Sequence, residues 1–493
     1  MNKQPHTIHP TWRRLLLAAL AGSVPGSALA GLDDFVGTPL ETAAADANQA
    51  TFEALRDPNV PDRDVPLPGL SDEQVQVFSN VRELVHTFNE LSGSGATEFS
   101  LGLDAEGLGF ALRWTAAEEL AAQGSLSTEI GKGQLAYLAG RLSQLRVGGG
   151  GVSIVGLPVS WDAGAYAANS TSAPGETMEA GTGFSRFSGF VNGSLGYGDK
   201  APTDLEAAFD FDGGETIVGG DYRFSDSWVM GGSIGFSQAE IDFDSSQSIV
   251  DGGIETDALS LGLYGLFTGE RFYADAALSY SAIDYDVTRR IVYPSLNPDI
   301  ANTDETALSS TEGSQLALST GMGYMGYVGR FSWEPFLRFD YLDTDIDGFT
   351  ETNTSNGGFD LAVGDQGFSS LDGSAGLQLA MTFTPRQMVL VPFLRASYHR
   401  EFDDDQRAVA AVYLNGEDPT FGSTQDFGVP TDPPDEDYYK IALGLSAVVR
   451  GGRVTRDDGV ARGGIQLFVQ YETIEDLDNY NNANITGGFR YEF

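Results

Sequence analysis

Apolar and polar residues alternate with a period of two through the last ten positions of the chain, 484–493. Ile485, Phe489, Tyr491 and Phe493 belong to one set, and the other set holds an amide, a hydroxyl and two charges. Successive side chains of a β-strand point to opposite faces, so this strand has one aromatic face and one polar face. The edge of a soluble sandwich is one interpretation. The other is a strand of an outer-membrane barrel, whose outer face meets lipid and whose inner face lines a polar lumen.

The same alternation recurs in eleven earlier segments, which favours the barrel. We therefore predict an all-β membrane barrel of twelve antiparallel strands between residues 184 and 493. Short turns alternate with long, acidic connections, as expected of periplasmic turns and outer loops. The segment 450–462 breaks this rule, so either the strands beside it are longer or this turn is extended. The expected strands are 185–198, 211–224, 228–242, 256–268, 272–286, 311–328, 331–342, 371–383, 388–401, 438–449, 464–472 and 481–493.

The strand 331–342 assigns its two faces with little ambiguity. Trp333, Leu337 and Tyr341 belong to the set expected to face lipid, and Arg338 belongs to the opposite set. The strand 388–401 repeats the pattern, which places Arg395 in the lumen. The side chains that we expect to line the lumen are Glu334, Arg338, Asp340, Arg395, Asp275 and Glu492.

The pattern before the barrel is helical. A capping box begins at Ser71, and apolar residues follow at helical spacing until Gly93. A short alternation within 99–112 predicts a small hairpin, whereas 31–56 is polar and rich in alanine. A second capping box at Thr115 opens a longer helix that ends near 146. We therefore expect two helices in 31–148, followed by an extended connector over 149–183.

The helix 115–146 is slender enough to occupy the lumen, because it is rich in glycine and alanine. Its length also suffices to cross the hydrocarbon core of a bilayer. The alternative is that this helix packs outside and that the connector 152–182 threads the barrel. The residues of the helix that we expect to lie within the lumen are Glu118, Glu119, Glu129, Lys132, Leu135, Arg141 and Arg146.

The first thirty residues have the form of a secretory signal peptide. Arg13 and Arg14 precede a short apolar run, and Ala28 and Ala30 form a small-residue cleavage site. We expect export through the Sec translocon and a mature chain that begins near Gly31. Since no later stretch is apolar for some 18 residues, any membrane crossing must be made by strands.

Charge narrows the range of partners. The chain has 28 basic and 70 acidic side chains and a formal net charge of −42, which argues against nucleic-acid binding. The acidic outer loops offer at most a weak divalent-cation site, because the calcium-loop-like run from Asp343 lacks a bidentate glutamate. No cysteine is present, and no other cofactor is indicated.

The segments GFVNGS at 189–194, GGDYRF at 219–224, EPFLR at 334–338 and FRYEF at 489–493 resemble the translocator domain of autotransporters, the type V secretion family. The resemblance covers 184–493 and implies a twelve-stranded outer-membrane barrel that carries an N-terminal passenger to the cell surface. It also implies that a segment before the first strand stays in the lumen. The implied partners are outer-membrane lipid, lipopolysaccharide and the barrel assembly machinery, which would read Phe489, Tyr491 and Phe493. The expected passenger, 31–148, is shorter than a β-helical passenger and lacks its repeats.

Two other function classes compete with this interpretation. A general porin or channel needs a wide, unplugged lumen. A hydrolase needs a nucleophile within about 3 Å of a base. Only His86 and His399 remain after the signal peptide, and we expect neither to act as a base. The sequence therefore indicates no enzyme and no catalytic residues.

Overall fold

Twelve long antiparallel strands close into one barrel, as the sequence pattern predicts. In the computed structural model, residues 31–60, 64–147, 183–184, 186–243, 250–354, 357–385, 388–403, 406–417, 427–450, 453–454, 460–462 and 464–492 are described. The twelve strands are β2 (Phe187–Lys200), β3 (Phe209–Arg223), β4 (Trp228–Phe243), β5 (Gly252–Thr268), β6 (Phe272–Tyr293), β7 (Thr303–Tyr324), β9 (Phe331–Ile346), β13 (Gln366–Met381), β14 (Val389–Glu401), β17 (Asp437–Arg450), β20 (Ile465–Glu475) and β21 (Tyr480–Glu492).

Each long strand pairs with the next one along the chain, and β21 pairs with β2 to close the ring. Closure leaves none of the long strands with an unpaired edge. Burial alternates along the strands: in β9, Trp333, Leu337 and Phe339 are exposed, whereas Glu334 and Arg338 are buried. The exposed row is apolar because it faces lipid, and the buried row is polar because it faces the lumen.

The two ends of the barrel differ in their connections. Tight turns lie at the end where β2 begins and β21 finishes, which we call the turn end, and longer connections lie at the opposite, loop end. The exceptional connection 451–464 is an extended turn, in which β18 (Arg453–Val454) pairs with β19 (Val460–Arg462). β19 also pairs in parallel with β1 (Gly183–Phe184), which precedes the first barrel strand.

The loop end carries short strands of its own. β10 (Phe349–Thr350), β12 (Leu361–Val363), β15 (Ala408–Tyr413) and β16 (Phe427–Pro430) form a small sheet from two connections. β11 (Thr352–Asn353) extends the barrel sheet at this end, whereas β8 (Gly326–Val328) extends it at the turn end. Strands β5, β6 and β7 run further toward this end than the sequence suggests, because their inner faces there are covered by the N-terminal helices, as at Ile291 and Tyr293.

Two helices at the loop end follow from local capping. α2 (Asp72–Ser92) begins at the predicted capping box, where Ser71 and Gln74 bond reciprocally, and it ends at Gly93 with a left-handed φ of 73°. α1 (Pro39–Leu55) follows η1 (Leu32–Asp34) in the segment to which no element was assigned. Thr38 and Glu41 form its capping box, and Pro39 occupies the first turn, where a missing N–H costs nothing.

The hairpin predicted within 99–112 is wrong, since α3 (Ala105–Thr115) occupies that region. The Asp104 carboxylate accepts a 2.9 Å hydrogen bond from the Gly107 N–H and so caps a helix instead. The buried residues Leu108, Leu112 and Thr115 follow helical spacing, and Phe110 is exposed. The described part of 31–147 therefore holds four α-helices and not the two expected.

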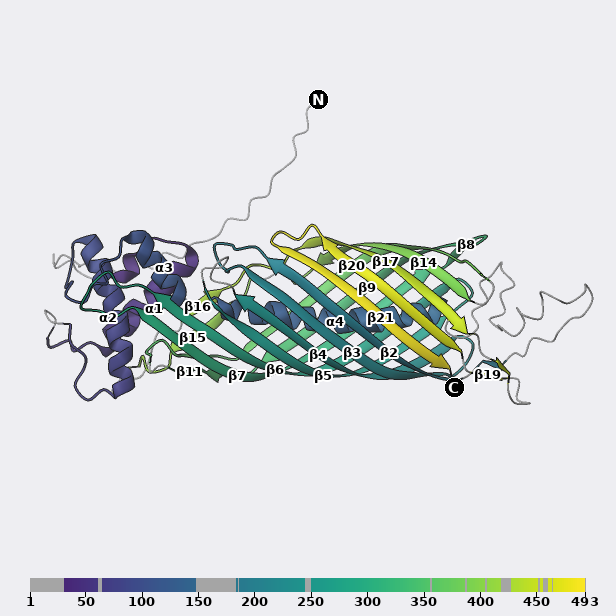
Figure 1. Cartoon of the computed structure of the whole chain (residues 1–493), viewed down its shortest axis with the longest axis horizontal. Helices are drawn as coiled ribbons and strands as arrows, with labels where there is room; N and C mark the ends of the chain where they lie inside the picture. Colours follow the sequence, from purple (N-terminus) through teal and green to yellow (C-terminus); the bar gives the residue numbers. More distant parts are fainter. Residues whose placement is uncertain are drawn as a thin grey trace, which may run out of the picture.

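The longest helix, α4 (Glu119–Val147), starts later than the capping box at Thr115 predicts. Thr115 ends α3, and its hydroxyl donates to the Leu112 carbonyl and accepts from Asn48. Ala117 follows with a φ of 57°, which separates the two helices. α4 then runs inside the barrel and contacts β4, β5, β6, β7 and β9 (Figure 1). The connector assigned to the lumen in the alternative lies outside the described residues.

The helices η1 and α1–α3 form a cap on the loop end of the barrel, and we use the word cap for these four elements (Figure 1). One apolar core runs from the cap into the barrel: it includes Phe52 and Phe78 from the helices and Tyr293, Phe359 and Tyr413 from the barrel and its loops. Burial of these side chains fixes the cap on the barrel mouth. The described helices include none with the length and apolar composition that crossing a membrane requires.

Candidate functional site

The middle of α4 is held by one glutamine that reaches two strands. The Gln134 carbonyl oxygen accepts hydrogen bonds of 2.8 Å from Ser279 and 2.9 Å from Ser281, both on β6. Its amide nitrogen donates to the Ser260 hydroxyl on β5. Because both ends of one buried amide are satisfied by the wall, Gln134 fixes the height of the helix in the lumen.

About two turns toward the loop end, α4 is anchored through its backbone. The Gln315 amide on β7 donates a 2.8 Å bond to the Ser127 carbonyl and a 2.9 Å bond to Thr344 on β9. A Cβ on Gly131 would collide with the same Gln315 side chain, so glycine at this position allows the contact. The Ser127 hydroxyl also lies 2.6 Å from the Tyr285 hydroxyl. These bonds give a physical reason for a glycine inside the helix.

The other end of α4 is held by charge. The Arg141 guanidinium is fully buried and pairs with Asp221 on β3. Asp221 also accepts a 2.8 Å hydrogen bond from Ser188, and Arg141 lies over the Phe190 ring at 4.6 Å. Since Asp221 is close to the turn end and Gln315 lies nearer the loop end, α4 extends along the lumen from one end toward the other.

The other helix residues selected from the sequence have varied contacts. Glu118 pairs with Arg113 of the cap at 2.6 Å and not with the barrel wall. Glu119 is fully buried, and its carboxylate has no hydrogen-bond partner from another described residue. Lys132 lies 5.6 Å from the centre of the Tyr438 ring. Leu135 packs with Ala317 and Leu342 of the wall. The side chains of Glu129 and Arg146 lie outside the described structure.

The charged wall residues selected from the sequence mainly contact one another. Arg338 on β9 donates to Asp275 on β6 at 2.8 Å and to Ser319 on β7 at 2.5 Å, so it links three successive long strands. Arg395 lies over the Phe336 ring at 4.2 Å. Glu334 is buried, and Asp340 is partly buried beside Arg338. Arg338 thus finds its counter-charge on the wall itself, and α4 is held by hydroxyl and amide groups, by the Arg141–Asp221 pair and by apolar side chains such as Leu138.

Of the remaining residues selected from the sequence, Phe489 and Tyr491 are described, and the other four lie wholly or in part outside the described structure. Phe489 of the terminal strand is exposed on the outer face, and Tyr491 is half-buried. The Glu492 backbone pairs with Ser188, but its side chain is outside the described structure, as is Phe493. Ala28 and Ala30 also lie outside the described residues. Among the described residues, no group of three or more His, Cys, Asp or Glu side chains could hold a metal ion.

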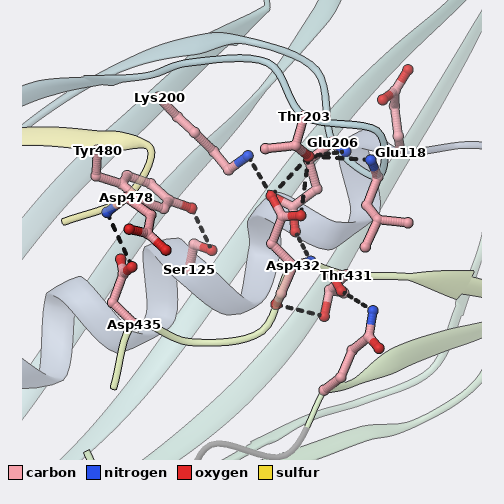
Figure 2. Close-up of polar contacts among 12 residues, drawn as sticks. Glu118, Ser125, Lys200, Thr203, Glu206, Thr431, Asp432, Asp435, Asp478 and Tyr480 are labelled. Carbon is pink, nitrogen blue, oxygen red and sulfur yellow. Dashed lines mark hydrogen bonds and ion pairs between the residues drawn. The ribbon is translucent and has the colours of Figure 1, made fainter. Parts of the chain in front are cut away.

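Figure 2 shows a polar cluster at the loop end that the sequence did not predict. The buried Lys200 ammonium pairs with Asp432 at 2.8 Å and with Glu206 at 3.3 Å. Thr203 also donates to Asp432, whose own N–H donates to Glu206 at 2.8 Å. These contacts join the β2–β3 loop to the long β14–β17 connection. Because Lys200 and Asp432 are 232 residues apart in sequence, no local pattern could indicate the pair.

A cavity of about 350 Å³ lies beside this cluster, between α4 and the barrel wall. Ser125 of the helix and Tyr480 of β21 meet at its edge through a 3.2 Å hydrogen bond (Figure 2). Aromatic side chains such as Phe211 and Phe368 share the lining with charged groups such as Arg407. Smaller cavities of about 120 Å³ and 50 Å³ follow along α4 toward the turn end.

The two histidines have defined partners. His86 Nδ1 accepts the Phe99 N–H at 3.1 Å, so Nε2 carries the proton that bonds to Asp64, also at 3.1 Å. The His399 ring forms 2.9 Å hydrogen bonds with both Ser397 and Asp372. A serine, a histidine and an aspartate are thus linked by hydrogen bonds. The sequence did not indicate this triplet, although Ser397 and His399 lie on the same face of one strand.

The Ser397–His399–Asp372 triplet lacks the oxyanion-binding groups that acyl transfer also requires. An oxyanion needs preorganised hydrogen-bond donors beside the nucleophile. Around Ser397 the β14 backbone is paired on both sides, with β13 through Gly376 and with β17 through Lys440. Its N–H groups therefore belong to the barrel ladders. Tyr438 stacks on His399 with ring centres 4.8 Å apart and donates to Asp372, which completes a buried hydrogen-bond network.

A closed barrel with an apolar outer face, a polar inner face and a helix of the same chain inside defines a class: outer-membrane translocator barrels. The model of the autotransporter β-domain matches residues 189–455, more than half of the chain. The chain belongs to the autotransporter family. Its barrel is an outer-membrane translocator domain, and such a domain is not itself catalytic.

The chain is also similar to a curated relative and to two solved structures. Esterase EstA of Pseudomonas aeruginosa is 26% identical over 220 residues, which is 44% of this chain and 32% of that protein. The match thus spans about a third of the curated relative. The translocator domain of the autotransporter NalP from Neisseria meningitidis has a TM-score of 0.45 and 16% identity over 62% of this chain and 88% of that one. The transport unit of AIDA-I from Escherichia coli gives 0.40 and 15%, over 67% and 98%.

Proposed function

We propose that this autotransporter holds its own N-terminal cap at the cell surface by means of α4. The observation that carries the proposal is the course of α4, from the cap at the loop end to the Arg141–Asp221 pair near the turn end. In outer-membrane barrels, short turns face the periplasm and long loops face outward. The cap then lies outside the cell, and the helix connects it to the periplasmic side. A general porin is less well supported, because α4 occupies the lumen.

The cap is a passenger that remains attached. A helical passenger that is released needs a polar surface where it leaves the barrel, whereas the cap shares one apolar core with the barrel loops. The Arg289–Glu351 pair, with a 2.6 Å bond beneath the cap, also ties β6 to the long β9–β13 connection. Release of the cap would expose the shared apolar surface and the Arg289–Glu351 pair to water. We therefore place the cap, η1 and α1–α3, permanently at the surface.

The proposed route begins with the signal peptide, cleaved after Ala30 and exported by the Sec translocon. The barrel assembly machinery then reads the terminal strand, and the barrel settles in lipid beside lipopolysaccharide. Phe489, Tyr491 and Phe493 supply the aromatic side chains of that strand. Deleting Phe493 should lower the amount of heat-modifiable barrel in outer-membrane fractions far more than Tyr491→Phe. Equal barrel levels in the deletion and the wild type would contradict this assembly signal.

We also propose that the chain as a whole is no esterase. Neither histidine is placed to activate a serine beside a free oxyanion site: His86 uses both ring nitrogens, and the strand around Ser397 is fully laddered. Purified protein should therefore hydrolyse short nitrophenyl esters no faster than its His86→Ala and His399→Ala variants. Hydrolysis that disappears in either variant would overturn this part of the proposal.

Labelling on intact cells tests the display directly. Leu91 is exposed in α2 of the cap, and Arg330 is exposed in the β8–β9 turn at the opposite end. A membrane-impermeant thiol reagent should label Leu91→Cys on intact cells and label Arg330→Cys only after the outer membrane is opened. Labelling of Arg330→Cys alone on intact cells would show that the barrel has the reverse orientation. Protection of both positions would contradict surface display of the cap.

A further inference from the structure

The cavity of about 350 Å³ at the loop end has the size of a small-molecule site, for which about 300 to 1,000 Å³ is usual. We call it the loop-end cavity: α4 forms one side, and strands such as β3, β13 and β17 form the other. Among the described residues that line it, none belongs to the cap. The cap core and the loop-end cavity are therefore separate features of the loop end.

Aromatic side chains form much of the lining. Phe211 of β3 and Tyr480 of β21 lie with ring centres 6.5 Å apart, and Phe209 lies 6.2 Å from the same Tyr480 ring. Phe368 of β13 and Leu126 of α4 add further apolar surface. Because transfer of apolar groups from water to such walls is favourable, the loop-end cavity suits a ligand with an apolar body.

Arg407, which lies between β14 and β15, adds a cation to this lining. Its guanidinium carbon lies 4.2 Å from the centre of the Phe368 ring. A Cβ on Gly124 of α4 would come within 2.7 Å of the Arg407 Nη1 atom. The guanidinium thus lies between an aromatic ring of the wall and the backbone of the helix.

The Arg407 guanidinium has no acceptor in the described part of the chain. It forms no hydrogen bond and no ion pair with another described residue. Burial lowers the pKa of Arg407, while Glu206 and Asp403 oppose this shift from beyond 4.0 Å. A guanidinium nevertheless stays charged at neutral pH. Since a partly buried cation without an acceptor is unfavourable, this position favours an anion that the described wall does not supply.

Two lysines lie at the inner end of the loop-end cavity. The ammonium groups of Lys132 on α4 and Lys440 on β17 each lie 5.6 Å from the centre of the Tyr438 ring. Among the described residues, neither has a carboxylate within 4.0 Å. Both also line the cavity of about 120 Å³ that follows along α4. Lys132 lies about 12 Å along the helix from Gly124, so cations lie at both ends of the aromatic lining.

The carboxylates of the lining already have donors in the wall. Glu401 accepts 2.6 Å hydrogen bonds from the Ser370 hydroxyl and the Leu371 N–H. The other carboxylates are bound in a similar way: Glu206 and Asp432 by Lys200, Asp403 by the Ser369 hydroxyl, and Asp435 by the Asp478 N–H (Figure 2). The described lining therefore joins carboxylates that have partners to three cations that have no carboxylate partner. A negatively charged ligand complements this arrangement.

We propose that the loop-end cavity binds a small amphipathic organic acid. Its carboxylate pairs with the Arg407 guanidinium, which offers two parallel N–H donors, and its apolar body lies against Phe211 and Phe368. A neutral ligand of the same shape leaves the guanidinium without a charged acceptor, and a cationic ligand is repelled by it. This inference goes beyond surface display of the cap and depends only on the position of α4 in the lumen.

Calorimetry with cinnamate tests the site. The full chain is placed in phosphatidylcholine nanodiscs, and the heat from empty nanodiscs is subtracted. Wild type should bind cinnamate at least about tenfold more tightly than the neutral cinnamamide, because a charged acceptor strengthens the hydrogen bonds. Arg407→Gln should weaken cinnamate binding by at least about tenfold and change cinnamamide binding by no more than about twofold.

Two further variants control for charge and for the cavity itself. Arg400→Gln removes an equal charge at the loop end, where Arg400 is exposed and pairs with Glu436 at 3.5 Å, so cinnamate should bind as to wild type. Ser125→Phe adds a ring to the lining and should abolish binding of both ligands. Heat-modifiable gel mobility confirms that each barrel is folded before it is titrated.

Four outcomes would overturn the proposal. One is equal affinity of the wild type for cinnamate and cinnamamide, and another is unchanged cinnamate binding in Arg407→Gln. Cinnamate binding that persists in Ser125→Phe would place the ligand outside the loop-end cavity. Absence of binding to the wild type at about 1 mM cinnamate would show that the cavity takes no such acid.

Discussion

The two parts of the N-terminal region meet the barrel in different ways. Inside, α4 contacts the wall through polar groups, such as Gln134 against Ser279 and Ser281, and also through apolar side chains such as Leu138. Outside, the cap meets the loop end through an apolar core that includes Phe52 and Leu361. Polar groups can exchange protein partners for water, whereas apolar groups have no equivalent partner in water. The polar contacts of α4 therefore suit a wet lumen, and the apolar contacts of the cap suit a final docked position.

The largest expected effect is on the stability of the cap, and it distinguishes the cap from α4. Phe52 is buried and stacks on Phe78 with ring centres 5.6 Å apart, so Phe52→Ala leaves a cavity in the cap core. We expect the free energy of opening the cap to fall by about 4 kcal/mol. Hydrogen exchange should accelerate in α1 and α2 and stay unchanged in α4. Equal acceleration in α4 would mean that the two parts open as one unit.

The converse change acts on the helix. Arg141→Leu removes the closer of the two cations beside buried Asp221 and leaves Arg490 at 4.0 Å, so we expect local opening of α4 to become easier by up to about 3 kcal/mol. Exchange should increase at the end of α4 near Val147 and not in the cap. The double variant Arg141→Leu, Asp221→Leu removes this pair, leaves Arg490 bonded to Ser188, and should recover part of the lost protection. A double variant as mobile as the single one would show that packing, and not the ion pair, holds this end.

A pH dependence is expected in the cap. Burial raises the pKa of Glu83 to about 7, Arg82 opposes this shift, and Glu305 adds to it. Below about pH 4.5 the carboxyl is protonated in both the folded and unfolded states. As pH rises from about 4.5 to about 7, only the folded cap keeps the proton, so its free energy of unfolding decreases.

The expected loss over this range is about 1 to 2 kcal/mol, reduced because Glu83 keeps part of its exposure. Urea unfolding of the cap, followed by the fluorescence of buried Trp114, measures it at each pH. Glu83→Gln should raise stability at neutral pH and flatten the dependence. A slope that persists in Glu83→Gln would assign the effect to another acid, such as Glu118, whose pKa burial raises to about 7.

The smallest effect compares two glycines of the same helix. A Cβ on Gly131 meets Gln315, whereas a Cβ on Gly140 meets nothing within 4 Å among the described atoms. Gly140→Ala should stabilise α4 by up to about 1 kcal/mol, because alanine favours the helix. Gly131→Ala should destabilise it by a similar amount, because the Gln315 bonds are displaced. Hydrogen exchange in α4 distinguishes the two, and equal effects would contradict the packing assigned to Gly131.

The barrel could be predicted from the sequence because the residue pattern of each strand reflects the surroundings of its two faces. In β9, lipid on one side and lumen on the other impose a strict alternation from Phe331 onward. α2 was equally clear, because its capping box is made entirely by neighbouring residues. Local chemistry decides such elements, and a single sequence contains it.

The cap and the loop-end cluster could not be predicted in the same way. Leu108 and Leu112 fit both a strand and a helix, and only the Asp104 cap and the packing on α1 decide between them. Lys200 at the end of β2 pairs with Asp432 of the β14–β17 connection, which lies close only in the closed barrel. The short strands β12 and β15 pair with each other from separate connections. These contacts form only when the ring closes. The sequence of a short segment does not show which distant residues that closure brings together.

The position of α4 is tested most directly by a pair of cysteines. Leu135 packs with Leu342 of the barrel wall, so Leu135→Cys and Leu342→Cys should form a disulfide in the folded protein on intact cells. Leu135→Cys alone should resist an impermeant thiol reagent. The account would be contradicted if Leu135→Cys were labelled from outside while a cysteine in the connector, such as Ala167→Cys, cross-linked to the wall.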